Sequence, residues 1–126
     1  MLQPGSPGAG QRYATIVLTN HGSSICLLYG YGGMQLLDAA RHPLPTKMHR
    51  VASPAPRRIE FRPGASASSQ LHWTAVPGSE DVAGPACQPV PAFAEITPPD
   101  QRDFLMVAWS MGSVCQQGSI DQNAYV

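Results

Sequence analysis

Apolar and polar side chains alternate most regularly in two segments, residues 12–19 (RYATIVLT) and residues 67–76 (ASSQLHWTAV). In the first segment Ala14, Ile16 and Leu18 alternate with polar, aromatic or β-branched residues. A period of two residues is typical of a β-strand with one buried face. Both segments are therefore predicted strands.

Shorter apolar or alternating segments follow the same pattern and are separated by Gly, Pro, Asn and Ser, which favour turns. No window of ten or more residues lacks Gly and Pro while keeping the apolar spacing of a helix, so an all-β domain is predicted. The shorter predicted strands cover residues 24–29, 46–51, 57–62, 92–97, 103–109 and 120–126. Residues 34–38 are either a further strand or a continuation of residues 24–29.

A glycine-rich interruption divides the apolar segment CLLYGYGGMQLL, residues 26–37. Glycine inside a strand pattern marks a bulge, a corner or a close backbone approach. In a helix each glycine costs about 1 kcal/mol relative to Ala, so a helix is disfavoured here. We predict that the chain crosses between two sheets at this point. Seven or eight short strands at this spacing predict an immunoglobulin-like antiparallel β-sandwich.

Composition limits the classes of partner. The chain has 126 residues, which is the size of one domain, and eight basic residues balance eight acidic ones. A net charge of zero, with His neutral, gives no long-range attraction to nucleic acid or to an anionic membrane. We therefore expect no nucleic-acid partner, and no apolar run is long enough to predict a transmembrane segment.

The first residues and the cysteines bear on the compartment. Residues 1–11 are predicted to be a flexible leader rich in Pro, Gly and Ser, and residues 12–126 to be the domain. The leader lacks the charged start and apolar centre of a signal peptide. The three cysteines allow one disulfide and one free thiol outside the cytoplasm, or three buried thiols inside it.

Several unusual segments occur in an order that resembles the actinobacterial DUF4232 domain family. They are VLTN, CLLYGYGGMQLLDA, PLP, FRPGASASSQLHW, ITPPD and a closing cysteine, and together they cover residues 12–126. The family has no assigned function. The resemblance implies a small secreted protein or lipoprotein of the cell envelope, folded as an immunoglobulin-like sandwich with disulfides.

Two departures from the family pattern carry further implications. Members usually begin with one more strand that bears a cysteine, after a secretion signal, whereas this chain begins where that strand would end. The resemblance therefore implies that Cys26 is a free thiol and that Cys87 pairs with Cys115. It also implies an exposed edge at residues 12–19 or at the neighbouring strand, which predicts a homodimer through that edge or through a Cys26–Cys26 bridge.

No candidate catalytic or metal site has a specific spacing. The four histidines, His21, His42, His49 and His72, are scattered, so neither a metal nor a cofactor is predicted. Cys26 lies among apolar residues, which disfavour a reactive thiolate. Ser110 lacks the surroundings of a nucleophile elbow, and no catalytic residue is predicted. The carboxylates Glu80, Asp81, Asp100 and Asp103 are interpreted as solvated loop charges rather than as a calcium site.

The YGYGG motif is the one candidate binding surface. Tyr29 and Tyr31 beside a bend at Gly32 and Gly33 would suit a sugar or a peptide. The alternative is that the glycines only permit the bend and the tyrosines pack. The motif is not a phosphate-binding loop, because it lacks the lysine and the strand–loop–helix context.

Two functions remain open from the sequence. The first is a non-enzymatic, extracytoplasmic interaction or binding module for an unknown protein or small molecule. The second is a small cytoplasmic enzyme or biosynthetic accessory protein with a pocket between the sheets, rimmed by the long loop at residues 77–88. An acid or base lining such a pocket would favour the second.

Overall fold

The structure is a computed structural model, and it describes residues 1–5, 8, 10–79, 81, 87–99 and 104–126. Within these residues the chain forms ten strands and one four-residue helical turn, α1 (Cys115–Gly118). The all-β prediction is confirmed, although ten strands form rather than seven or eight. The strands are β1 (Leu2–Pro4), β2 (Gln11–Thr19), β3 (Cys26–Tyr29), β4 (Gly33–Leu37), β5 (Lys47–Arg50), β6 (Arg58–Phe61), β7 (Ser66–Thr74), β8 (Phe93–Thr97), β9 (Leu105–Ala108) and β10 (Ser119–Gln122).

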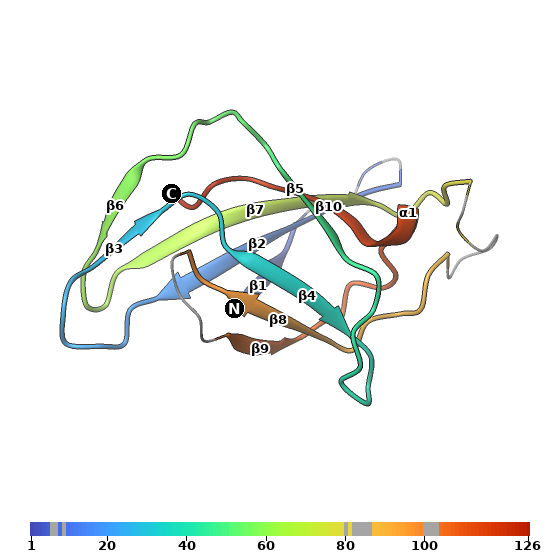
Figure 1. Cartoon of the computed structure of the whole chain (residues 1–126), viewed down its shortest axis with the longest axis horizontal. Helices are drawn as coiled ribbons and strands as arrows, with labels where there is room; N and C mark the ends of the chain where they lie inside the picture. Colours follow the sequence, from blue (N-terminus) through green and yellow to red (C-terminus); the bar gives the residue numbers. More distant parts are fainter. Residues whose placement is uncertain (6–7, 9, 80, 82–86, 100–103) are drawn as a thin grey trace.

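Three sheets make up an open sandwich. Sheet A has the strand order β1-β2-β7-β10-β5, sheet B pairs β3 with β6, and sheet C has the order β4-β8-β9. Figure 1 shows β4 and β8 layered in front of the long strands β2 and β7, with β3 and β6 at one end. Every strand pair is antiparallel except β5 with β10, which is parallel.

The pairing of β2 with β7 forms the centre of sheet A. Nine residue pairs join them, from Gln11 opposite Thr74 to Thr19 opposite Ser66. Because side chains alternate between the two faces of a strand, one face is buried and apolar and the other is polar. The buried face packs against sheet C, and the polar face points away from the core.

Two tryptophans fill the middle of the sandwich. Trp73 on β7 and Trp109 after β9 are both buried, and their ring centroids lie 5.1 Å apart. Such tilted aromatic pairs add to the stability that burial alone provides. The other large apolar core residues include Ile16, Leu28, Leu36, Leu71, Ile96, Ile120 and Tyr125.

The GYGG interruption is a crossing between sheets, as the sequence predicts. It ends β3 in sheet B and begins β4 in sheet C. Gly32 is needed for a close backbone approach, because a Cβ atom there would lie 2.3 Å from the Thr97 carbonyl oxygen. The Gly32 carbonyl also accepts a hydrogen bond of 3.1 Å from the buried side chain of Gln122.

The leader predicted for residues 1–11 differs in the structure. Leu2–Pro4 forms strand β1 and pairs antiparallel with β2, with Leu2 opposite Ile16. Leu2 packs against the core, and the Val17 amide donates a 2.8 Å hydrogen bond to the Met1 carbonyl. β1 pairs with residues 14–16 of β2, so residues 12–19 do not form the exposed edge that the resemblance implies there. Strand β1 lies before residue 12, where the resemblance implies no strand.

Among the described residues there is no helix with the length and apolar character needed to cross a membrane.

Candidate functional site

A polar hollow lies on the outer face of sheet A, on the side away from the core. Its volume is about 700 Å³. We call it the outer-face hollow. The described residues that line it are Gln11, His49, His72, Trp73, Thr74, Val76, Gln116, Ser119 and Asp121. Strands β2, β7, β10 and β5 supply most of this lining, so the hollow rests on a paired sheet rather than on loops.

His72 is the side chain with the most contacts in the hollow. Its Nδ1 lies 3.2 Å from Asp121 Oδ2, and its Nε2 lies 2.5 Å from Gln11 Oε1. Its ring also stacks on Tyr13, with the ring centroids 4.9 Å apart. Three neighbours from two adjacent strands therefore fix the orientation of this imidazole.

The strand register brings a second histidine into the same row. His72 on β7 pairs with Asp121 on β10, and Asp121 pairs with His49 on β5. Paired residues point to the same side of a sheet, so all three side chains face the hollow. Tyr13, which pairs with His72, extends the row to a fourth strand.

This row contributes little to folding. The side chains of His72 and Asp121 are 35% and 49% exposed. Surface ion pairs of this kind stabilise a protein by about 0–1 kcal/mol. The polar atoms of the pair are therefore accessible to a ligand in the hollow.

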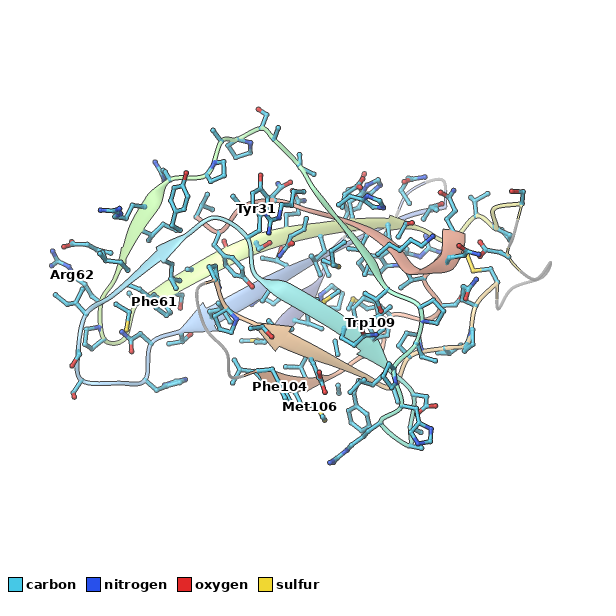
Figure 2. All side chains as sticks on the ribbon, viewed as in Figure 1. Tyr31, Phe61, Arg62, Phe104, Met106 and Trp109 are labelled. Carbon is cyan, nitrogen blue, oxygen red and sulfur yellow. A yellow bond between two sulfur atoms is a disulfide. The ribbon has the colours of Figure 1, made fainter. Side chains whose placement is uncertain are left out.

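Only the two tyrosines of the surface predicted around the YGYGG motif line a hollow in the structure. Tyr29 and Tyr31 both line a hollow of about 250 Å³, together with Arg50. The Tyr31 hydroxyl donates a 2.5 Å hydrogen bond to the Val51 carbonyl, and the Arg50 guanidinium lies 5.1 Å from the centre of its ring. Tyr31, labelled in Figure 2, thus bridges the chain before β4 to the end of β5.

The two glycines of that predicted surface do not line the described hollow. The backbone at Gly32 packs closely against the Thr97 carbonyl oxygen. Gly33 begins β4, where it pairs with Thr97. Ligand binding at Tyr29 and Tyr31 stays a prediction.

The cysteines lie as the family resemblance implies. Cys87 and Cys115 form a disulfide with Cα atoms 5.5 Å apart, and both are fully buried. It joins the loop before β8 to α1. Cys26, on β3, is a free and exposed thiol.

A single carboxylate, that of Asp81, organises the backbone beside this disulfide. It accepts hydrogen bonds from the Gly78 amide at 2.7 Å, the Gln88 side chain at 2.5 Å and the Gln117 amide at 3.0 Å. The Gln116 amide also donates to it. Gln116 and Gln117 both have positive φ, so their amides point the same way and form an anion-binding concavity. The sequence interpretation of Asp81 as a solvated loop charge is wrong for this reason.

The same contacts shift the pKa of Asp81. Desolvation by partial burial acts to raise it, but the four hydrogen bonds to the carboxylate outweigh that effect and lower the pKa from 3.8 to about 2. A carboxylate with a lowered folded-state pKa stabilises the fold above its unfolded pKa and loses that contribution on acidification.

We therefore expect Asp81→Asn to lower the free energy of unfolding by about 2 kcal/mol at neutral pH. The difference from the wild type should stay constant above about pH 4 and shrink between about pH 4 and pH 2, where the wild-type carboxylate takes up its proton. Urea unfolding at a series of pH values measures both. Glu60→Gln, which removes an exposed carboxylate paired with Arg62, is the control and should change stability by under about 0.5 kcal/mol. An unchanged difference down to pH 2 would contradict this account of Asp81.

Asp81, Cys87 and Cys115 also form the one group of three potential metal ligands whose atoms lie within 4.8 Å of one another among the described residues. The two sulfurs are bonded to each other, and the carboxylate oxygens already accept hydrogen bonds. This group is therefore structural in the oxidised protein.

A further hollow of about 330 Å³ opens at one end of the sandwich. Its described lining is Pro4, Gly5, Arg12, Tyr13, Trp73, Ser110 and Met111. Arg12 and Tyr13 are the ionisable side chains of that lining, and neither a carboxylate nor an imidazole belongs to it.

Several sequence candidates do not come together. His21 and His42 do not line the outer-face hollow, and His42 instead pairs with Asp38 at 3.7 Å. Glu80, Asp100 and Asp103 lie outside the described residues.

The grouping of Gln11, His49, His72 and Asp121 was not predicted from the sequence. The alternation did place His72 on the polar face of its strand. What it could not supply was the order of strands in sheet A, which sets β10 between β7 and β5.

Comparison with known proteins gives a family but no relative of known activity. No curated protein and no solved structure matches the chain. Residues 1–125 match DUF4232, a domain of unknown function. The matched region includes residues 1–11 and so extends beyond the resemblance drawn from the sequence. Because the match covers nearly the whole chain, this protein belongs to the DUF4232 family.

Proposed function

We propose that the protein is a non-enzymatic, extracytoplasmic binding module and that its ligand site is the outer-face hollow. The observation that carries the proposal is the row of polar side chains in that hollow. Such side chains on a rigid sheet are held ready to bind, and they contribute little to folding. Polar groups converging in a concave site are what a specific ligand requires.

The buried disulfide supports the location outside the cytoplasm, because disulfides persist mainly in oxidising compartments. Protease treatment of intact cells that make this protein tests the location. The proposal predicts that the chain is digested while cytoplasmic markers survive. Full protection until the cells are lysed would favour the cytoplasmic alternative.

Site-specific photo-crosslinking tests the binding site. A photoreactive phenylalanine analogue is placed at Val76, which lines the hollow and is exposed, or at Gln70, an exposed position on β7 that does not line it. Each protein is irradiated with a cell-envelope extract. We expect adducts from Val76 that Gln70 does not give and that excess wild-type protein suppresses.

The His72→Ala variant supplies the matched competitor in that experiment. It should suppress the Val76 adducts less well than the wild type does, because it lacks the imidazole that contacts Gln11, Tyr13 and Asp121 in the hollow. Identical adducts from both positions, or equal competition by the variant, would contradict the assignment of the hollow.

Self-association forms a second part of the proposal. Cys26 is exposed. Strand β9 is the edge strand of sheet C, and Phe104 just before it and Leu105 at its start are each 51% exposed. Figure 2 shows Phe104 and Met106 along this outer edge. Exposed apolar edges favour pairing with another strand.

Light scattering with and without reductant tests self-association, and a dimer is expected. A dimer lost in reductant and in Cys26→Ser would assign the bridge, whereas one lost in Leu105→Lys would assign the β9 edge. A monomer under both conditions would contradict this part of the proposal.

A further inference from the structure

Three side chains in the outer-face hollow have the chemistry of transition-metal ligands. His72, Asp121 and His49 occupy paired positions on β7, β10 and β5. Adjacent strands are about 4.8 Å apart, so the three backbone positions span about 10 Å. We propose that His72, Asp121 and His49 bind a divalent transition-metal ion, best matched by zinc. This inference rests on the proposed function of the hollow as a ligand site.

The orientation of His72 is the first argument. His72 Nδ1 faces Asp121 Oδ2 at 3.2 Å, and His72 Nε2 lies 2.5 Å from Gln11 Oε1. A metal bound through Nδ1 would leave the ring hydrogen on Nε2, where it would donate to the Gln11 amide oxygen. Gln11 is therefore in the position of the outer hydrogen-bond partner of a metal-binding imidazole.

The spacing of these two atoms is the second argument. Zinc binds imidazole nitrogen and carboxylate oxygen at about 2.0–2.2 Å in a tetrahedral arrangement, which sets neighbouring ligand atoms about 3.4 Å apart. The observed separation of Nδ1 and Oδ2 is 3.2 Å. A zinc ion therefore requires these atoms to move apart by only a few tenths of an ångström.

The third ligand comes from the other side of Asp121. The His49 ring makes no hydrogen bond, ion pair or ring contact with any residue in the described ranges, so it is free to rotate toward the hollow. The ligand atoms of the three residues do not all lie within 4.8 Å of one another in the structure, so zinc binding requires the His49 ring to rotate toward Asp121. Within the same ranges Asp121 Oδ1 also lacks a hydrogen-bond partner.

The open side of the site fits the same assignment. Three protein ligands leave a fourth zinc position for water or a bound group from the hollow, as in zinc sites with an open position. Two imidazoles and one carboxylate favour zinc, nickel or copper over calcium or magnesium, which prefer oxygen ligands.

The chain contains its own matched control. His42 and Asp38 form another surface histidine–aspartate pair, at 3.7 Å, but neither residue lines the outer-face hollow. If zinc bound any exposed histidine beside a carboxylate, His42 would bind it as well as His72 does.

Isothermal titration of the tag-free full chain with zinc chloride tests the assignment. We expect one zinc ion per chain. His49→Ala and His72→Ala should each weaken binding by about tenfold or more, and Asp121→Asn by about 10–100-fold. His42→Ala should bind zinc as the wild type does. In NMR spectra the imidazole signals of His49 and His72 should shift on titration while those of His42 stay in place.

Absence of one-to-one binding, or wild-type affinity in His49→Ala, would overturn the metal assignment. If His72→Ala fails to fold, His49→Ala still tests the proposal, since the His49 ring makes no hydrogen bond, ion pair or ring contact with a described residue. Photo-crosslinking from Val76 is measured without added zinc. Adducts specific to Val76 in a protein that does not bind zinc would therefore overturn the zinc inference alone. Equal adducts at Val76 and Gln70 would overturn the proposed function.

Discussion

Replacing Cys87 and Cys115 together by serine is expected to lower the free energy of unfolding by about 3.5 kcal/mol. The disulfide joins residues 28 positions apart. In the chain-entropy model, a crosslink of that span lowers the conformational entropy of the unfolded chain enough to stabilise the fold by about 3.5 kcal/mol. Both positions are fully buried, so the serine hydroxyls would also lose contact with water. Urea unfolding followed by the fluorescence of Trp73 and Trp109 measures the change.

Cys26→Ser is the matched control for this double variant. Cys26 is exposed and unbonded, so its replacement should change stability by under about 0.5 kcal/mol. Adding reductant to the wild type should reproduce the loss seen in the double variant. Equal stability of the wild type and the double variant would show that the disulfide does not hold the loop before β8 to α1.

Replacing Gly32 by alanine is expected to cost about 3 kcal/mol. The new Cβ atom would lie 2.3 Å from the Thr97 carbonyl oxygen and 3.3 Å from the Tyr125 ring. Backbone cannot yield as a flexible side chain does, so β4 and β8 must separate, and overpacking of this kind costs about 1–3 kcal/mol. Thermal or urea unfolding measures the loss.

Neighbouring glycines in the same motif separate this steric effect from a general intolerance of alanine. At Gly33 a Cβ atom would meet nothing nearer than 3.7 Å, so Gly33→Ala should be nearly neutral. Gly30 has φ of +88° with nothing within 4 Å of a Cβ atom, so Gly30→Ala should cost about 1–2 kcal/mol from backbone strain alone. Equal stability of Gly32→Ala and Gly33→Ala would contradict the close packing of the Gly32 backbone against the Thr97 carbonyl oxygen.

Local patterns in the sequence predict the strands but not all of their partners. The alternation at residues 12–19 and 67–76 identifies β2 and β7, because each has one polar and one apolar face. The glycines near Tyr31 indicate a crossing between sheets, since only glycine permits the approach to Thr97. Strand β1 has only three residues, which is too short for alternation to reveal. Its Pro/Gly-rich surroundings predict a flexible leader instead.

The candidate site depends on contacts that no local pattern contains. His49 and Asp121 meet through a parallel pairing of two four-residue strands far apart in the chain. The order of strands in a sheet is set by burial of the whole core, so the sequence around His49 does not indicate its neighbour. The Asp81 contacts were missed for a similar reason, because the left-handed backbone at Gln116 and Gln117 favours glycine, and neither residue signals it.

The parallel register of β5 with β10 is the central claim, because it alone brings His49 beside Asp121. Cross-strand nuclear Overhauser effects between backbone protons of these strands measure it directly. The account predicts contacts that join Lys47 to Ser119 and His49 to Asp121. A register shifted by one residue, which would turn the His49 ring away from the hollow, or no contacts between β5 and β10, would contradict it.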